Sequence, residues 1–600
     1  MGSNLILLLN LTKMEIEKIF KQVTGIATDP DQKEDLINIG YLNAIDHISF
    51  IIEFMKRWVV YIDQMLMKHE KGTKEHAEIF NSRGFTYQEF CLMLDGSIDE
   101  KNYHRYPIFQ LMYIDDAIAR EEQRITGEDD ELSKPSRYQK AITDWIKKHN
   151  PKLELALMKT KIPIYLDLKS FKKSVHLLSS SGFGKSTLLK TVVHEIQRIS
   201  LKKRNISTVV IDPHSEMAVD LLRMKWNKID KGRLVFLDTN LRQTAKTICG
   251  YDVIGVDVGF SINPFDATGL TPFKQSSLAN EIARTIFSSI PTDDSLQMIT
   301  VLENLTEFLL ARPDSDMLDL LNLAGKGGME FYKQDTKRMK NHVRRSFMED
   351  VYEADNRLAS TKSSIQMRLL SILANLNVRQ FLTGPRSVDV EKLINSGHTV
   401  ICNFKGADVG EDGASLMTKI FFGILVSATL NRVTLPKQER IDTYLIADEF
   451  SKYYSDSVTT IIDQTRKFGL GSILSHQRVS QIRSENIEKA LGATSIKIAG
   501  PSDNDSISFM AGEMNHITAS DISGLDNFSF YYQDKMNKKA GTFKFRSAPF
   551  LADENSEHYM NKSELAKMFK WIAFESGYYR VVDNKIEGNQ IAYTHKFTEA

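Results

Sequence analysis

Two patterns of apolar residues alternate along this chain of 600 residues. From about residue 160, short runs rich in β-branched and aromatic residues are typical of strands that are buried on both faces of a parallel sheet. These runs lie at residues 175–178, 208–211, 234–237, 399–403, 443–447, 472–474, 495–498 and 528–532. Because helical stretches separate them, the pattern predicts an α/β domain with a mostly parallel sheet.

Helical periodicity dominates two other stretches. Residues 1–145 show apolar residues at roughly helical spacing, and this predicts a helical N-terminal domain. Between 271 and 385 strand patterns are lacking, and we expect helices at 277–289, 295–310, 317–323 and 336–382. The predicted organisation is thus an α/β domain over 160–270 and 386–550, an all-α insertion over 271–385, and a C-terminal extension over 551–600.

Composition changes this picture little. Apolar residues make up 42% and charged residues 26%, and 77 basic residues balance 77 acidic ones. This is ordinary globular composition without the basic excess of a chain that binds nucleic acid along its whole length, although local patches remain open. Three distant cysteines without metal-type spacing indicate buried thiols in a reducing compartment: Cys91, Cys249 and Cys402. The apolar stretch 47–66 carries charges and favours an amphipathic helix, so we expect no direct membrane span and a cytoplasmic location.

A small-residue loop follows the apolar run at 175–178 and precedes an apolar helical stretch. Its sequence from Ser179 to Thr187 is Ser-Ser-Ser-Gly-Phe-Gly-Lys-Ser-Thr, which matches a phosphate-binding loop except at its first position. Backbone N–H groups of such a loop cradle phosphates, so we expect ATP to be bound by Ser181, Gly182, Phe183, Gly184, Lys185, Ser186 and Thr187. Lys185 would reach the β- and γ-phosphates, and the Ser186 hydroxyl would bind Mg²⁺. Serine at 179 is a poor choice if that position needs a positive φ.

The apolar run at 443–447 ends in two carboxylates, Asp448 and Glu449. In an ATPase of this type the first acid holds Mg²⁺ and the second polarises the attacking water. The next predicted strand leads to Gln477, a candidate sensor of the γ-phosphate, and Arg466 lies just before that strand as a candidate arginine finger. The residues therefore predict a catalytic set of Lys185, Glu449, Gln477 and Arg466, with Mg²⁺ ligands Ser186 and Asp448.

Four further stretches carry a family resemblance: Asp-Pro-His-Ser-Glu at 212–216, Asn-Pro-Phe-Asp at 263–266, Asp-Glu-Phe at 448–450, and Arg-Lys-Phe-Gly at 466–469 with Gln477. Together with the loop, their order resembles the FtsK–HerA superfamily of ring-shaped DNA-pumping ATPases, and most of all its conjugative coupling-protein branch (TraG/TraD-type). The resemblance covers about 160–550. It implies a RecA-like P-loop NTPase domain with an inserted all-α domain.

Three positions or segments depart from the family pattern. Ser179 replaces the first loop glycine, and Ser215 replaces the glycine of the Asp-Pro-His-Gly segment. A helical N-terminal domain stands where membrane-anchored coupling proteins carry spanning helices.

The resemblance implies an ATP-driven, ring-forming and hexameric DNA translocase that serves conjugation or mobilisation. Its partners would be DNA, further copies of itself, and relaxosome or secretion-system proteins, the last at an inner-membrane complex. Three alternatives stay open: a HerA-like repair, defence or packaging motor, a secretion ATPase that moves protein, and a nucleotide-gated scaffold with little turnover. A basic segment at 337–345 is either a phosphate contact or a solvated helix face paired with Glu349 and Asp350.

Overall fold

The computed structural model describes residues 35–43, 147, 161–203, 205–267, 272–287, 295–339, 341–353, 358–453, 461–462, 464–482, 485–515, 517–535, 542–547 and 557–582. The chain divides into two compact units. The first unit comprises residues 1–170, 178–192 and 495–549, and the second comprises 171–177, 193–494 and 550–600. Nearly all of the expected N-terminal domain (1–145) lies outside the described residues.

The first unit contains neighbouring strands in the order β2 (Lys161–Asp167), β1 (Leu36–Asn43), β12 (Thr542–Arg546), β11 (Ser529–Asp534) and β10 (Ile496–Ala499). The pairs β2–β1, β1–β12, β12–β11 and β11–β10 are antiparallel. The helices α25 (Asn504–Glu513) and α26 (Ala519–Ser523) belong to the same unit. The first two turns of α9 (Lys185–Lys203) also lie in it.

Strand β1 corrects the expectation of helix at residues 36–43, within the predicted N-terminal helical domain (1–145). Its residues Leu36 and Ile37 are buried, and the strand pairs over its length with β2, which lies far away in the sequence. Gly40 has a φ of 148°, and a Cβ there would lie 2.1 Å from the carbonyl oxygen of Arg546. Close pairing with strands from distant parts of the chain, which local periodicity does not report, therefore decides this element.

The second unit holds strands in the order β3 (Val175–Leu178), β9 (Leu470–His476), β8 (Asp442–Ala447), β4 (Ile206–Asp212), β7 (Thr399–Asn403) and β5 (Leu234–Asp238). The pairs β9–β8, β8–β4, β4–β7 and β7–β5 are parallel. Nearly every residue of these strands is buried, as continuous apolar runs predict. All eight predicted strands are present, six of them here and two as β10 and β11 of the first unit.

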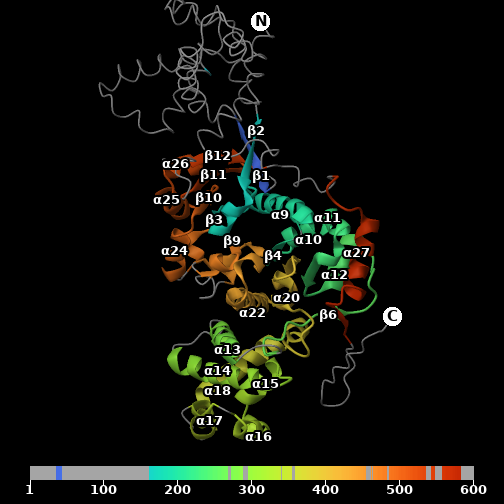
Figure 1. The fold of residues 1–600 in the computed structure, drawn as a ribbon, viewed down its shortest axis with the longest axis vertical. Helices are drawn as coiled ribbons and strands as arrows, with labels where there is room; N and C mark the ends of the chain where they lie inside the picture. The colour runs from blue at the N-terminus through green and yellow to red at the C-terminus, as the bar shows by residue number, and fades with distance from the viewer. Residues whose placement is uncertain are drawn as a thin grey trace, which may run out of the picture. The chain divides into compact units, whose positions relative to one another are not determined.

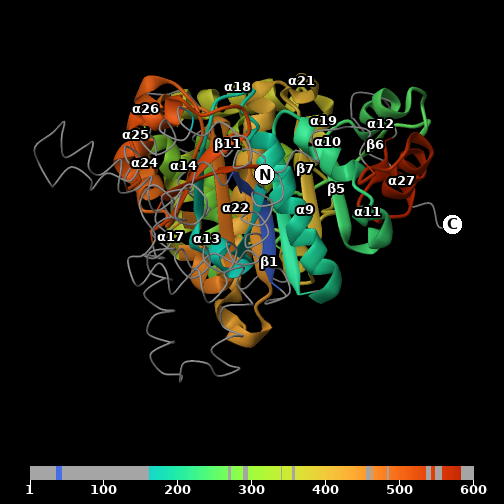
Figure 2. The same ribbon diagram turned by 90° about the horizontal axis from the view of Figure 1, so that it is seen from above.

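Besides the insertion and the end of α9, the second unit also contains the helices α10 (Glu216–Arg223), α11 (Trp226–Ile229), α12 (Leu241–Cys249), α20 (Val390–Ile394), α22 (Glu411–Leu430), α24 (Glu485–Gly492) and α27 (Lys562–Phe574). Figure 2 shows α27 of the C-terminal extension beside α12 and the short strand β6 (Val258–Gly259), which pairs with β13 (Arg580–Val581). Among the described residues, one helical stretch, Glu411–Thr434, is long and apolar enough to cross a membrane. Because 78% of its apolar window is buried within the structure, core packing accounts for its composition.

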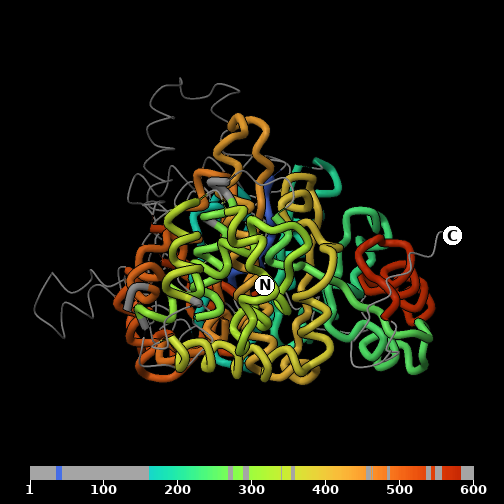
Figure 3. The backbone as a smooth tube through the Cα atoms, turned by 90° about the horizontal axis from the view of Figure 1, so that it is seen from below, coloured from blue at the N-terminus to red at the C-terminus, as the bar shows by residue number. Residues whose placement is uncertain are grey.

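The described part of the predicted insertion contains helices and turns but no strand. It contains α13 (Pro272–Phe287), α14 (Ser295–Leu310), α15 (Met317–Ala324), α16 (Lys333–Lys337), α17 (His342–Ser346), α18 (Ala359–Leu373) and α19 (Leu376–Leu382). Figures 1 and 3 show the helices α13 to α18 gathered at one end of the second unit. The single helix predicted over 336–382 is wrong, because this stretch is broken into several shorter helices.

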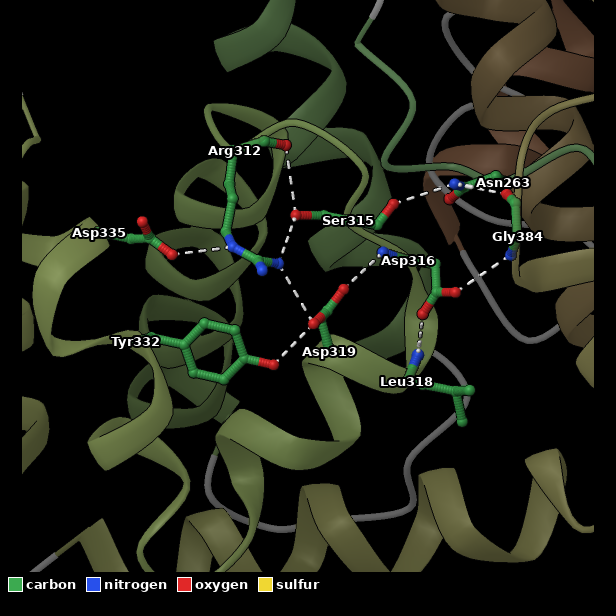
Figure 4. A network of polar contacts seen from close by, with 9 residues as sticks. All are labelled: Asn263, Arg312, Ser315, Asp316, Leu318, Asp319, Tyr332, Asp335 and Gly384. Atoms are coloured by element: carbon green, nitrogen blue, oxygen red, sulfur yellow. Dashed lines mark hydrogen bonds and ion pairs between the residues drawn. The ribbon is translucent and has the colours of Figure 1, made fainter. Parts of the chain in front are cut away.

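A polar network fastens the two chain passages that lead into and out of the insertion (Figure 4). The Nδ2 of Asn263, in the Asn-Pro-Phe-Asp segment, donates to the carbonyl oxygens of Ser315 and Gly384, at 2.9 Å each. The carboxylate of Asp316 accepts from the Gly384 amide at 3.0 Å and caps α15. This segment therefore anchors the insertion to the domain that carries it.

Candidate functional site

The phosphate loop (residues 179–187) belongs to the first unit, and its last three residues form the start of α9. Gly182 and Gly184 have φ values of +85° and +91°, a conformation that glycine adopts without strain. The Gly184 carbonyl accepts from the Leu188 amide at 3.0 Å, which begins the helix. Lys185 and Ser186 stand in its first turn, where backbone N–H groups and the helix dipole favour bound phosphate.

Ser179 fits its place without backbone strain, because it is not among the residues with positive φ. Its side chain is fully buried against Gly500, where an added Cβ would lie 2.5 Å from the Ser179 Oγ. Two backbone hydrogen bonds of 2.8 Å flank this contact: Gly500 N–H donates to the Leu178 carbonyl, and Ser180 N–H to the Pro501 carbonyl. A glycine on the facing segment thus makes the room that a serine in the loop needs.

A second cluster lies at the carboxyl ends of β4, β8 and β9 in the second unit, and we call it the carboxylate cluster: Asp212, Asp448, Glu449 and Gln477. Glu449 is 2% exposed and has a φ of 47°, which is uncommon for a residue that is not glycine. Its Oε1 accepts a hydrogen bond from Nε2 of Gln477 at 2.8 Å. The structure therefore brings together three of the predicted site residues: Asp448, Glu449 and Gln477.

Asp448 is held by residues that the sequence did not single out. Its Oδ1 accepts from the Ser475 hydroxyl at 2.6 Å and from the Glu449 amide at 3.0 Å. The hydroxyl of Tyr453 donates to the Asp448 carbonyl oxygen, and burial raises the pKa of that phenol well above its usual value. Ser475 lies two residues before Gln477, but no local pattern indicates that its hydroxyl faces Asp448.

Asp212 ends β4, the strand beside β8, and it is 1% exposed. Burial, and then the nearby charge of Asp448, raise the pKa of Asp212 to about 6. Its two carboxylate oxygens accept from the amides of His214 and Ala218 at 2.8 Å each. Asp212 thus shapes the turn into α10 and places a second carboxyl group beside Asp448.

Ser215 lies in this turn with a φ of 77°, so this position does require the left-handed conformation that the family pattern meets with glycine. A serine there carries backbone strain, on the order of 1 kcal/mol. The two replacements of glycine by serine therefore differ in backbone strain, which is absent at 179 and present at 215.

A histidine pair joins the strand before the phosphate loop to the strand that ends at the candidate sensor. His176 on β3 and His476 on β9 are fully buried, with 2.7 Å between their Nε2 atoms and ring centroids 5.0 Å apart. Nδ1 of His476 lies 2.9 Å from the Arg478 carbonyl oxygen, so it must carry the proton and donate. With neutral rings, Nε2 of His476 then accepts from His176, and the pair fixes the backbone on both sides of Gln477.

Arg466 is exposed on the short helix η13 (Thr465–Phe468). The segment behind it is held by Arg432, which is 1% exposed. Arg432 donates to the carbonyls of Ile394, Ile441 and Phe468, at 2.7, 2.9 and 3.1 Å. Sequence reasoning missed Arg432, because nothing local distinguishes it from a surface arginine.

Part of the basic segment of the insertion (337–345) forms contacts within the insertion. Arg344 pairs with Glu307 and donates to Asn304 at 3.0 Å, and not to Glu349 or Asp350 as one alternative expected. Lys337 and Arg338 are exposed on this segment. Among the described residues of this segment, Asn341, His342 and Val343 are exposed as well.

A phosphate loop between a strand and a helix, in an α/β fold with parallel strands, places the chain among the P-loop NTPases of RecA-like fold. Residues 154–420 match the family model described as "Helicase HerA, central domain". This stretch holds the phosphate loop, the segment at 212–216 and the insertion, so the expected relation to the FtsK–HerA superfamily is confirmed there. The carboxylates at 448 and 449 lie beyond the matched residues.

Comparison with solved structures finds similar chains at low identity. The bacterial conjugative coupling protein TrwB is 12% identical with a TM-score of 0.47, over 64% of this chain and 86% of that one. TrwB with a non-hydrolysable ATP analogue is 14% identical with a TM-score of 0.47, over 66% and 89%. VirB4 of Thermoanaerobacter pseudethanolicus is 15% identical with a TM-score of 0.41, over 63% and 91%. Comparison with curated proteins finds no match.

Proposed function

We propose that this chain is an ATP-driven, ring-forming DNA translocase that acts as a coupling protein in conjugative transfer or mobilisation. The observation that carries the proposal is the arrangement of Glu449. The residue is buried, its backbone is in the left-handed conformation, and its carboxylate is hydrogen bonded to Gln477. A carboxylate fixed in this way beside a second acid is suited to orient and deprotonate a water molecule. The family match and the motif order support the motor class.

The residues present fit a nucleotide with Mg²⁺. In the first unit, the loop combines two glycines of positive φ with a helix N-terminus, and Lys185 and the Ser186 hydroxyl follow at once. In the second unit, Ser475 orients the carboxylate of Asp448, whose oxygen atoms are of the kind that Mg²⁺ prefers. When bound, Mg²⁺ would neutralise phosphate charge, with Ser186 and Asp448 as its protein ligands.

Each remaining residue has a defined task in this proposal. Lys185 neutralises charge on the β- and γ-phosphates, and Glu449 accepts the proton of the attacking water. Gln477 holds the Glu449 carboxylate and senses the γ-phosphate, while the exposed Arg466 serves a neighbouring subunit as a finger. Lys337 and Arg338 of the insertion contact DNA phosphates.

The test is ATP hydrolysis by the purified protein with and without single- and double-stranded DNA, beside the variant Lys185→Ala. We expect DNA to stimulate turnover and the variant to lose at least about 100-fold, since its charge acts on the transferred phosphoryl group. Lys202→Ala is the matched control, because Lys202 is exposed at the far end of the same helix.

Other outcomes point to the alternatives. Turnover that is indifferent to DNA favours a motor that moves protein. Nucleotide binding without turnover favours a gated scaffold. Turnover that survives Lys185→Ala contradicts the site itself.

A further inference from the structure

Phe528 lies against the phosphate loop in a strained conformation. It stands directly before β11 in the first unit, its side chain is half-buried, and its φ is 66°. A bulky aromatic residue in this region of the Ramachandran plot is a genuine outlier, and such residues persist only where their surroundings hold them. Nothing in the sequence motifs draws attention to this position.

Two backbone hydrogen bonds hold Phe528 in place. Its N–H donates to the carbonyl oxygen of Phe183, inside the loop, at 2.9 Å. Its own carbonyl oxygen accepts from the Ser547 amide at 2.8 Å, directly after β12. Phe528 thus ties the loop to the strands β11 and β12, which pair with each other over five residue pairs.

The first of these bonds determines the direction of a loop amide. In a planar trans peptide the C=O of one residue and the N–H of the next point in opposite directions. Because the Phe183 carbonyl points at Phe528, the N–H of Gly184 points away from it. The bond therefore fixes the direction of this amide, and loop amides of this kind are the donors that cradle phosphate.

The phenyl ring also packs against the loop. A Cβ at Gly184 would lie 2.4 Å from Cδ1 of Phe528 and 3.1 Å from its Cα. The ring therefore packs directly on the Gly184 backbone, which has a φ of +91°. A ring in this position restricts the freedom of the loop's glycines before any ligand is bound.

We propose that Phe528 is a positioning residue for nucleotide binding, which holds the phosphate loop preorganised through its backbone N–H and its ring. The inference rests on the proposed nucleotide site. This arrangement strains the backbone at Phe528. It strengthens nucleotide binding, because a loop that is already ordered loses less conformational entropy when the nucleotide binds.

The experiment measures two quantities on the full chain: the Kd for N-methylanthraniloyl-ADP with Mg²⁺, and the urea unfolding midpoint without nucleotide. Phe528→Gly keeps the backbone N–H and relieves the strained φ but removes the ring. We expect its Kd to rise about tenfold while its unfolding midpoint stays equal or rises. A residue with a merely structural role would change affinity and stability in the same direction.

Two further variants and a control sharpen the result. Phe528→Tyr retains the ring and should restore the wild-type Kd to within about twofold, whereas Phe528→Leu should raise it about threefold. Phe545→Leu is the matched control, since Phe545 is a buried aromatic residue of β12 in the same unit, 5.8 Å from Phe530 between ring centroids. It should lower the unfolding midpoint and leave the Kd unchanged.

Three outcomes decide the matter. A tenfold weaker Kd for Phe528→Gly with undiminished stability supports the inference. A Kd that is unchanged, or that weakens only in step with stability, overturns it while the nucleotide site stands. If the wild-type protein does not bind the probe, or binds it equally after Lys185→Ala, the proposed function itself fails.

Discussion

The phosphate loop and the carboxylate cluster are built in opposite ways. The loop is made by backbone conformation: its glycines take positive φ values, and Ser181 and Gly182 are exposed. The cluster is made by buried side chains, with Asp212, Asp448 and Glu449 at most 4% exposed. Consecutive residues are enough to form a backbone loop that binds phosphate, whereas a buried carboxylate needs hydrogen-bond partners from several strands.

Replacement of glycine by serine shows the same contrast. Ser179 in the loop carries no strain because Gly500 makes room for its side chain. Ser215 beside the cluster stays in a left-handed conformation and bears the strain itself. The same replacement therefore has different consequences at the two positions. At 179 a neighbouring glycine makes room for the serine side chain, whereas at 215 the serine keeps a strained backbone conformation.

The largest expected effect tests the cluster. Glu449→Gln preserves size and an oxygen that can accept from Gln477, but removes the base. We expect ATP turnover to fall about 10²- to 10⁴-fold while ATP affinity changes less than about threefold, measured by single-turnover hydrolysis and equilibrium binding. Glu439→Gln, at an exposed position of the same unit, is the control. Turnover within about threefold of wild type would remove Glu449 from the role of base.

An intermediate effect tests the compensation in the loop. Gly500→Ala places a Cβ 2.5 Å from the Ser179 Oγ and 2.8 Å from its Cβ, so we expect the free energy of unfolding to fall by about 1–3 kcal/mol. Adding Ser179→Gly should recover at least half of this loss in urea unfolding. Gly512→Ala in α25 is the control, because its Cβ meets nothing within 4 Å. Equal losses in the single and double variants would contradict the compensation.

The smallest effect compares the two serines directly. Ser215→Gly relieves a positive φ, and we expect the free energy of unfolding to rise by about 0.5–1 kcal/mol. Ser179→Gly relieves nothing and adds freedom to the unfolded chain, so a fall of similar size is expected. Thermal unfolding of both variants measures the two signs. The same sign for both would erase the distinction drawn from the backbone angles.

Sequence patterns predicted the parallel strands well, because strands buried on both faces are continuous apolar runs. They failed at β1, where pairing with distant strands overrides a weak local signal, and at 336–382, where one long helix was expected. Within the candidate site, the loop residues and the acids at 448 and 449 follow from local motifs. Ser475, Tyr453 and Phe528 do not, because each acts through a hydrogen bond that no local sequence pattern indicates.

The sequence by itself determined the class of protein, since a phosphate loop is a run of consecutive residues whose conformational needs can be read from glycine, lysine and serine. It also determined the positions of the strand that ends in two carboxylates and of the helical insertion. Only the tertiary structure decided that Gln477 meets Glu449, that Gly500 accommodates Ser179, and that Phe528 turns the loop amide of Gly184. The physical reason is that burial, hydrogen bonding and steric fit depend on neighbours in space, and these neighbours lie up to hundreds of residues apart in the chain.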